Sequence, residues 1–463
     1  MKKKILSMLL SMVLTVACFT GCGSNPSSGG ETGGAASTEI PKNPEDMYTV
    51  TMAVIGNDQE DMDLVEAEMN KILAEKVGAQ IDVITLGWGV YQQQLQLMLS
   101  GAEKLDLVPI MYNNVSTYVN SGQVLDMSDL IDQYGVNMKA ALGEDILKIA
   151  NMNGYVYGVP VEKEWYADSC LVMRKDILDK YNLDVSNVKS LADCAPIFET
   201  IHENEPDMKI IVGAKDGLIG NIYFADVLSD RFGVLDNGGA DTTIVNYYET
   251  DNYKNLAATV HDYYEKGYID KDMATSTDAG TTILKAGNAF CFATPYKPGV
   301  AEQESLNTGY ELVAVRINPT PAFCYTNAVA AITWGIGQNC ENPEMTMKVL
   351  DYMYGDPELM NLFNWGIEGV HYVIKDAEND VIGFPDGVDA SNAKYNLNMG
   401  WELPNQYKIH VWEGSSRKIM DAQKEMNATA NKSKALGFMF DSTSVSNEIA
   451  ALNNVVSEYS SSI

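Results

Sequence analysis

The chain has 463 residues, a formal net charge of −31, and 46% hydrophobic residues. This excess of acid argues against nucleic-acid binding, because phosphate recognition needs a basic footprint on the protein. The length exceeds what one hydrophobic core accommodates and predicts about two or three domains.

The first residues have the features of an export signal. Lys2–Lys4 form a cationic start, and Ile5–Val16 form an apolar run that is too short to span a bilayer. We therefore expect residues 1–21 to be a signal peptide. The sequence "FTGC" resembles the lipobox of bacterial lipoproteins, which implies acylation of Cys22. Cys18 is a weaker competitor, and secretion without a lipid is the alternative.

Residues 22–47 are rich in Gly, Ser, Thr and Pro and hold few apolar side chains. Such a segment cannot bury a core, so we expect a flexible tether. No later run is apolar and long enough to span a membrane. The remaining cysteines are widely spaced without a CxxC pair, and most are expected to be small buried side chains. They are Cys170, Cys194, Cys291, Cys324 and Cys340.

Strands alternate with helices from Tyr48 onward. Residues 48–56 alternate as a strand, and 60–79 place apolar residues on one helical stripe closed by Gly78. Another strand, helix and strand follow at 80–86, 90–103 and 105–112, which predicts a parallel α/β sheet. Ligands bind beyond the carboxyl ends of such strands. The residues expected on that rim are Asn57, Asp58, Trp88, Tyr112, Asn113 and Asn114.

A second set of elements follows. Residues 175–183, 190–206 and 253–267 are predicted as helices, and 209–214 and 282–296 lead into buried strands. Ser190 and Asp193 have the spacing of a capping box. Asn342-Pro343 and Asp356-Pro357 each have the pattern of a helix start, with Gly355 between the two helices.

Charged and aromatic residues interrupt the apolar stretch "GVPVEKEWYADSCLVMRKDIL", residues 158–178. This stretch, the lipobox, the tether and the alternating opening together resemble the extracellular solute-binding lipoproteins of bacterial ABC importers. The resemblance is to the maltodextrin-binding-protein-like class and its LplA-like branch. It implies an α/β, two-lobed, periplasmic-binding-protein-like (type II) fold. Each lobe would be a mostly parallel sheet flanked by helices, and crossing strands would join the lobes.

The resemblance also implies where the chain crosses between the lobes. The first crossing would follow the "GYVYGVP" segment, "AFCFATPY" would be the second, and "NPE...GDPE...NWGIEGVHY" would contain the third. Lobe 1 would then comprise residues 48–165 plus 294–336. Lobe 2 would comprise 166–293 plus 337–463, and truncation of its C-terminus is left open.

Crossing segments lie at the floor of the cleft in such proteins, where aromatic rings pack on sugar C–H faces and carboxylates accept from hydroxyls. Glu162, Glu164 and Trp165 are the first expected contacts. Alternation would place both glutamates on one face and point Lys163 away. Further candidates are Tyr223, Tyr296 and Trp365, while Trp88 is either a stacking platform or a buried ring. Trp334 is expected to be structural. Trp401 and Trp412 have no predicted place.

Catalytic patterns are weak. The histidines are scattered without an HExxH motif, and Ser415-x-x-Lys418 lacks the companion motifs of penicillin-binding proteins. We expect no cofactor, no metal ligand set and no catalytic residues; calcium stays open but unsupported.

The favoured function is therefore capture of a carbohydrate, most simply an oligosaccharide, by a lipid-anchored receptor on the extracellular face of a bacterial, Gram-positive-type membrane. Hinge closure would deliver the sugar to the permease subunits of an ABC importer. The expected receptor is a monomer that meets the membrane only through its N-terminal lipid and binds no nucleic acid. A surface-anchored glycoside hydrolase or lyase is the alternative class, and a peptide is the alternative ligand.

Overall fold

The computed structural model describes residues 43–101, 103–215 and 217–460. The predicted signal peptide and Cys22 lie outside these residues. Pro44–Asp46 forms a short 3-10 helix, and the first strand begins at Tyr48 as expected. Within the described ranges, no helix combines the length and apolarity that crossing a membrane requires.

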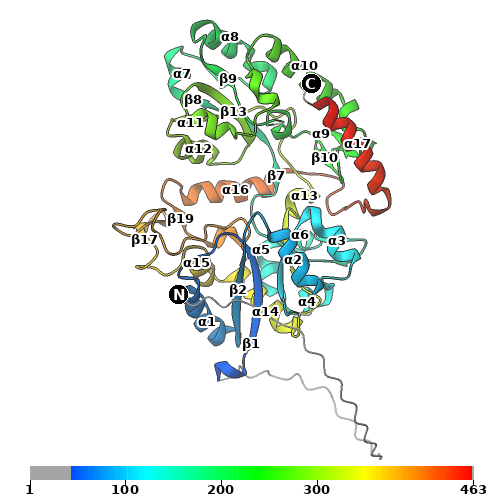
Figure 1. The fold of residues 1–463 in the computed structure, drawn as a ribbon, viewed down its shortest axis with the longest axis vertical. Helices are drawn as coiled ribbons and strands as arrows, with labels where there is room; N and C mark the ends of the chain where they lie inside the picture. The colour runs from blue at the N-terminus through cyan, green and yellow to red at the C-terminus, as the bar shows by residue number, and fades with distance from the viewer. Residues whose placement is uncertain (1–42, 102, 216, 461–463) are drawn as a thin grey trace, which may run out of the picture. The chain divides into compact units, whose positions relative to one another are not determined.

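The first sheet contains the predicted opening strands (Figure 1). Its order is β2 (Ala79–Leu86), β1 (Tyr48–Ile55), β3 (Leu107–Met111), β16 (Ile332–Ile336) and β6 (Val159–Pro160). β1 is parallel to β2 and to β3, whereas β16 is antiparallel to β3 and β6. The carboxyl ends of β1, β2 and β3 therefore share one edge, as predicted for the rim residues.

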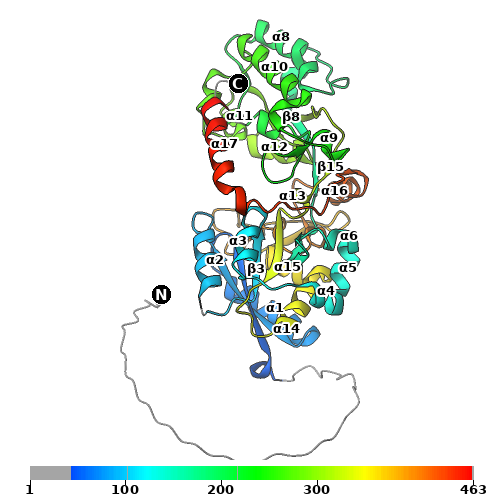
Figure 2. The same cartoon turned by 90° about the vertical axis from the view of Figure 1, so that its right-hand side faces the viewer.

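Helices cover this sheet, and we call the sheet with its helices the first lobe. They are α1 (Met62–Lys76), α2 (Tyr91–Ser100), α3 (Val115–Asn120), α4 (Ser128–Tyr134), α5 (Val136–Leu142), α6 (Glu144–Leu147), α14 (Pro343–Gly355) and α15 (Pro357–Trp365). α14 contacts β1, β16, α4 and α5, and α15 contacts α1. Figure 2 shows these late helices beside the earliest elements of the chain.

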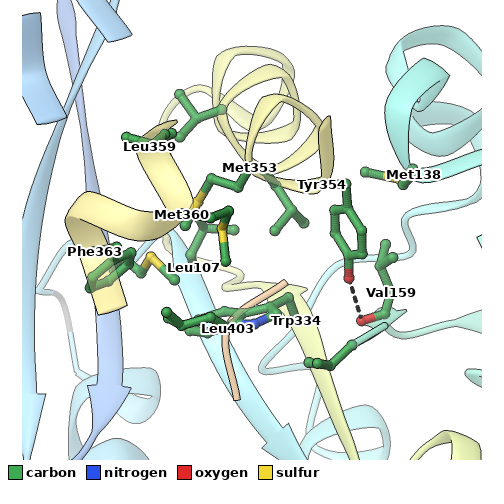
Figure 3. Close-up of a cluster of buried hydrophobic side chains, with 14 of the residues drawn as sticks. Leu107, Met138, Val159, Trp334, Met353, Tyr354, Leu359, Met360, Phe363 and Leu403 are labelled. Atoms are coloured by element: carbon green, nitrogen blue, oxygen red, sulfur yellow. Dashed lines mark hydrogen bonds between the residues drawn. The ribbon is translucent and has the colours of Figure 1, made fainter. Parts of the chain in front are cut away.

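The first core lies between this sheet and the late helices (Figure 3). Trp334 on β16 is fully buried, as expected, and its Nε1 donates to the Glu402 carbonyl at 2.8 Å. Tyr354 on α14 donates its hydroxyl to the Pro160 carbonyl at 2.7 Å. Met353, Met360 and Phe363 fill the space above Leu107. These contacts join segments that are far apart in the sequence.

The second lobe has its own sheet and core. The strand order is β14 (Leu312–Arg316), β8 (Ser169–Arg174), β13 (Ala289–Pro295) and β9 (Lys209–Ile211). Around it lie α7 (Lys175–Lys180), α8 (Ala195–Asn204), α10 (Asp251–Glu265), α11 (Gly280–Lys285) and α12 (Val300–Thr308). The expectation of a mostly parallel sheet fails here, because β8 is antiparallel to both β13 and β14. β8 leads away from the junction between the lobes, and its two neighbours lead back towards it.

Short paired segments join the lobes. β7 (Tyr166–Ala167) is antiparallel to β15 (Phe323–Cys324), which is parallel to β20 (Asn431–Lys432). The first crossing thus lies where it was predicted. The later crossings do not, because "AFCFATPY" forms β13, which is followed by α12 and β14 in the same lobe.

The predicted lobe boundaries need a matching correction. Residues 312–316, expected in lobe 1, pair with β8 in the second sheet. Residues 343–365, expected in lobe 2, form α14 and α15 in the first core. The sequence motifs did not distinguish a loop within one lobe from a segment that crosses between lobes, because both have the same local composition.

The last part of the chain contacts both lobes. Ser433 follows β20 and donates to the buried Asp226 of the second lobe at 2.5 Å. Met439 then packs in a core of the first lobe, and Asn120 donates to Thr443 at 3.1 Å. α17 (Ser446–Tyr459) returns to the second lobe and borders a groove with Phe232 and Tyr248.

Candidate functional site

A cavity of about 530 Å³ combines aromatic and charged side chains from distant segments. Its wall includes α12, the first crossing and the loop that contains β19 (Val411–Trp412). Trp365, Trp401 and Trp412 lie in this wall together with Glu164 and Gln406. We call this cavity the tryptophan pocket. Flat rings beside a carboxylate and an amide suit a ligand that has both apolar faces and hydroxyl groups.

Hydrogen bonds hold the wall in place. Trp365 ends α15, is 4% exposed, and donates its Nε1 to the His410 carbonyl at 3.2 Å. Its ring lies 5.0 Å from that of Trp412, centroid to centroid, at 33°. His410 Nδ1 lies 2.5 Å from Asp380, which also pairs with Arg417. These bonds tie the loop around β19 to α15 and to Asp380, and they fix the part of the wall that lies outside the helices.

The rim of the first sheet meets this pocket through a pair of indoles. Trp88 follows β2, is 49% exposed, and stacks on Trp401 with centroids 5.6 Å apart and an angle of 26°. Tyr91 packs edge-on against Trp88 at 6.0 Å. Trp88 is therefore an exposed platform and not a buried ring. The paired indoles present an apolar surface next to the pocket.

Glu164 supplies a carboxylate to the pocket. It lies 3.6 Å from Lys297 Nζ, and Gln406 Nε2 donates to it at 3.4 Å. Burial alone would raise the pKa of Glu164, but Lys163, Lys297 and hydrogen bonds outweigh burial and lower it. The group is therefore ionised at neutral pH and can accept hydrogen bonds from hydroxyls.

Glu162 does not share this face, contrary to the predicted alternation. Its side chain is 3% exposed and pairs with Lys424 at 2.9 Å. Its backbone forms an isolated bridge to Asn405. The chain bends at Lys163 instead of continuing as a strand, so the period of two is lost between the two glutamates.

The structure also argues against the predicted stacking role of Trp165. The side chain is 7% exposed and belongs to the first core. Its Nε1 donates to the Val161 carbonyl at 2.9 Å, and Asn427 accepts from its backbone N–H at 2.8 Å. The same bend turns the ring inward, because a large apolar surface is more stable in the core than in water.

Tyr112 and Tyr223 belong to a different group. Burial, followed by the charge of Asp226, raises the pKa of Tyr112 to about 12. Burial also raises the pKa of Tyr325, and Tyr223, Asp226 and Tyr112 add to this effect. The charge of Asp226 thus acts on Tyr112 and Tyr325, and Ser433 donates to the same carboxylate. These tyrosines are not in the wall of the tryptophan pocket.

The remaining candidates lie outside the pocket wall. Asn57 and Asp58 are exposed after β1, and Asn113 is exposed with Asn114 half-buried after β3. Tyr296 is half-buried, its ring lies under Arg316 at 4.9 Å, and its N–H donates to the Asp168 carbonyl at 2.9 Å. The predicted set is therefore divided, with Glu164 and Trp365 in the pocket wall and Trp88 stacked on it.

Comparison with known proteins identifies the family. The model of the bacterial extracellular solute-binding protein family matches residues 57–359. The chain belongs to this family. A second model, for a domain of unknown function, matches residues 434–463 of the solute-binding protein, which contain α17.

Similar proteins come from Streptococcus pneumoniae. A carbohydrate ABC transporter substrate-binding protein of the serotype 4 strain TIGR4 is 28% identical over 421 residues, 90% of this chain and 84% of the relative. The crystal structure of the N-glycan transport solute-binding protein NgtS is 26% identical, with 90% of each chain covered and a TM-score of 0.77. The NgtS complex with Man5GlcNAc has the same identity and coverage and a TM-score of 0.64. The solute-binding protein thus has the two-lobed type II fold.

Sequence reasoning missed the other half of the pocket. Trp401, Trp412 and His410 lie in a stretch without helical or strand period, and Lys297 and Glu302 follow a strand that was interpreted as a crossing. A usable signal was present, since "GWEL" and "VWEG" each place a tryptophan beside an acid in a polar, glycine-containing loop. Both tryptophans are half-buried, and binding residues are disproportionately found on loops.

Proposed function

We propose that this solute-binding protein captures an oligosaccharide in the tryptophan pocket and delivers it to an ABC importer. The observation that carries the proposal is the arrangement of Trp365, Trp401 and Trp412 with the ionised Glu164 in one cavity. The names of the similar proteins support it, because one is a carbohydrate transporter component and another is solved with a mannose-containing glycan.

The chemistry of the pocket fits this ligand. The half-buried indoles of Trp401 and Trp412 offer flat apolar surfaces to the C–H faces of sugar rings, and the buried Trp365 supports Trp412 from behind. Glu164 accepts from hydroxyls, and Gln406 both donates and accepts. A peptide would instead require groups that satisfy its backbone N–H and C=O, which flat rings do not supply. Asn57, Asp58, Tyr112, Asn113, Asn114, Tyr223 and Tyr296 remain candidates for contacts made when the lobes approach.

Closure of the lobes would complete the site. The paired crossing segments β7, β15 and β20 are short, so rotation of backbone torsions there can move one lobe against the other. A ligand that bridges both lobes stabilises the closed arrangement.

The proposal also specifies the partners, the oligomeric state and the location of the protein. Permease subunits of the importer would recognise the loaded, closed form, and the receptor would act as a monomer. Acylation of Cys22 would hold it on the extracellular face of the membrane, with residues 22–47 as the tether. The protein would bind and release the sugar without cleaving it.

Titration calorimetry and thermal unfolding with a glycan panel test the proposal. Ligand at about 100 times its dissociation constant should add about 2.7 kcal/mol to the free energy of unfolding. The sugar should be recovered unchanged after incubation. Stabilisation by peptides but by no sugar would overturn the carbohydrate assignment, and cleaved sugar would overturn the assignment as a receptor.

Trp401→Ala locates the site. Loss of the stacking surface should weaken sugar binding by roughly 1.5 to 3 kcal/mol, about ten- to hundred-fold. Tyr264→Ala is the matched control, because Tyr264 is an exposed aromatic residue, 43% accessible, on α10 of the second lobe. Equal affinity for both variants would exclude the tryptophan pocket as the binding site.

A further inference from the structure

The charges around the tryptophan pocket are unevenly distributed. Glu164, Glu302 and Glu413 lie in its wall, and Lys297 lies there as well. Lys297 is engaged by Glu164 at 3.6 Å. Glu302 and Glu413 are exposed, and neither forms an ion pair with any residue that the structure describes. The wall thus carries three glutamates and one lysine and is net negative, although the Lys375 side chain, outside the wall, approaches Glu413 beside Gly383.

Arg417 and Lys424, which lie near the pocket, are already paired inside the protein. Arg417 pairs with Asp380 and donates to the carbonyls of Ile409, at 2.7 Å, and Tyr407, at 3.2 Å. Lys424 pairs with the buried Glu162 at 2.9 Å. Arginine forks are the groups that bind carboxylates most specifically, and this fork is occupied. A ligand carboxylate would find repulsion from Glu302 and Glu413 and no free cationic partner of this kind.

We infer that the tryptophan pocket selects uncharged oligosaccharides and discriminates against the same sugars carrying a carboxylate. This inference rests on the proposed function and specifies its substrate class. Hydroxyls can donate to Glu164 and the other carboxylates, whereas the carboxylate group of a uronate only accepts. The long-range field of the acidic chain adds to the discrimination, although salt screens it beyond about 10 Å at 0.1 M ionic strength.

The experiment compares matched pairs of ligands. The neutral probes are Man5GlcNAc, Man1GlcNAc, maltohexaose and cellohexaose, and each is paired with a form whose primary hydroxyls are partly oxidised to carboxylates. For each neutral sugar that binds, we expect its oxidised partner to bind at least about tenfold more weakly at low salt. The ratio should shrink as ionic strength rises, because screening weakens repulsion between exposed charges.

Two double variants assign the effect to the pocket. Glu302→Gln with Glu413→Gln removes two of the three negative charges in the wall and should bring the oxidised sugar to within about threefold of the neutral one. Glu199→Gln with Glu265→Gln is the control, because it changes the net charge equally at exposed positions on α8 and α10. This control should leave the discrimination unchanged.

Equal or tighter binding of the oxidised sugars by the natural protein would overturn the inference while leaving carbohydrate capture in place. Equal rescue by both double variants would also overturn it, because the discrimination would then come from net charge and not from the pocket. Binding of neither form of any probe would instead count against the proposed function, and the inference would fall with it.

Discussion

Glu402 is a buried carboxyl group next to Trp401 in the chain. It is 0% exposed, and one of its oxygens accepts from the Ile55 N–H at 2.8 Å. The other oxygen has no hydrogen-bond partner among the described residues. Burial raises the pKa of Glu402 to about 8, although the Ile55 hydrogen bond acts in the opposite direction. The folded protein therefore holds a neutral carboxylic acid at neutral pH.

The burial of Glu402 predicts that the free energy of unfolding depends on pH. In the unfolded chain Glu402 loses its proton near pH 4.5, whereas the folded protein keeps it up to about pH 8. Between these values the folded state binds the extra proton, so this group lowers the free energy of unfolding as pH rises. Glu402→Gln cannot ionise, and its stability relative to the natural protein should increase by a few kcal/mol from pH 5 to pH 9.

Urea unfolding at pH 5, 7 and 9 measures this difference. Glu265→Gln, on the exposed face of α10, is the control and should follow the natural protein at every pH. Parallel stability curves for Glu402→Gln and the natural protein would show that the buried group does not titrate in this range.

Substitutions of Trp165 and Trp401 should have different effects, the first on stability and the second on sugar affinity. Trp165 lies in the first core, so Trp165→Ala should cost about 3 to 5 kcal/mol of stability. Trp401 is half-buried in the pocket wall, so its truncation should affect affinity more than stability. Chemical denaturation and calorimetry on both variants check this. A tenfold loss of sugar affinity in a stable Trp165→Ala protein would instead assign Trp165 to the binding site.

At the scale of elements, side-chain caps start the late helices of the first lobe. Asn342 accepts from the Met345 N–H at 3.1 Å at the start of α14, and Asp356 accepts from the Leu359 N–H at 2.8 Å at the start of α15. Proline follows each cap at the first helical position. These helices close the core over β1 and β16 and bring Trp365 to the pocket.

Removing one cap should therefore cost stability but not affinity. Asn342→Ala should lower the free energy of unfolding by about 1 kcal/mol, because an N–H at the helix start loses its acceptor. Asn342→Asp keeps an acceptor there and should stay close to the natural protein. Urea denaturation gives the stability, and calorimetry should show unchanged sugar affinity. A change in affinity would mean that α14 moves during binding.

At the scale of the whole molecule, the first lobe is assembled from segments that lie far apart in the sequence. Residues 343–365 cover strands formed by residues 48–111, and the segment after β20 contacts first one lobe and then the other. The proposed lipid anchor and its tether would hold both lobes near the membrane.

The anchor has a direct test. Cys22→Ala should release the protein into the medium, because the acyl group that is expected to hold it would be missing. Fractionation followed by immunodetection measures the distribution. Cys18→Ala is the control and should leave the protein in the membrane fraction. Release by Cys18→Ala but not by Cys22→Ala would move the lipidation site.

The local sequence pattern was sufficient to predict many of the helices, strands and helix caps of this protein. The opening strands and helices, the capping box at Ser190 and Asp193, the starts of α14 and α15 and the buried place of Trp334 were all predicted and are confirmed. Each depends on periodicity or on hydrogen bonds within a few residues, and the sequence determines such features locally.

The tertiary structure alone decided the pocket and the division into lobes. Trp401 and Trp412 lie in a loop whose conformation depends on contacts with α15 and with Asp380, far away in the sequence. A bend at Lys163 separates Glu164 from Glu162 and buries Trp165, which alternation could not foresee. Whether a strand crosses to the other lobe depends on its partner strand. Long-range packing selects among local conformations of similar energy. A short-range residue pattern therefore cannot predict which of these conformations the chain adopts.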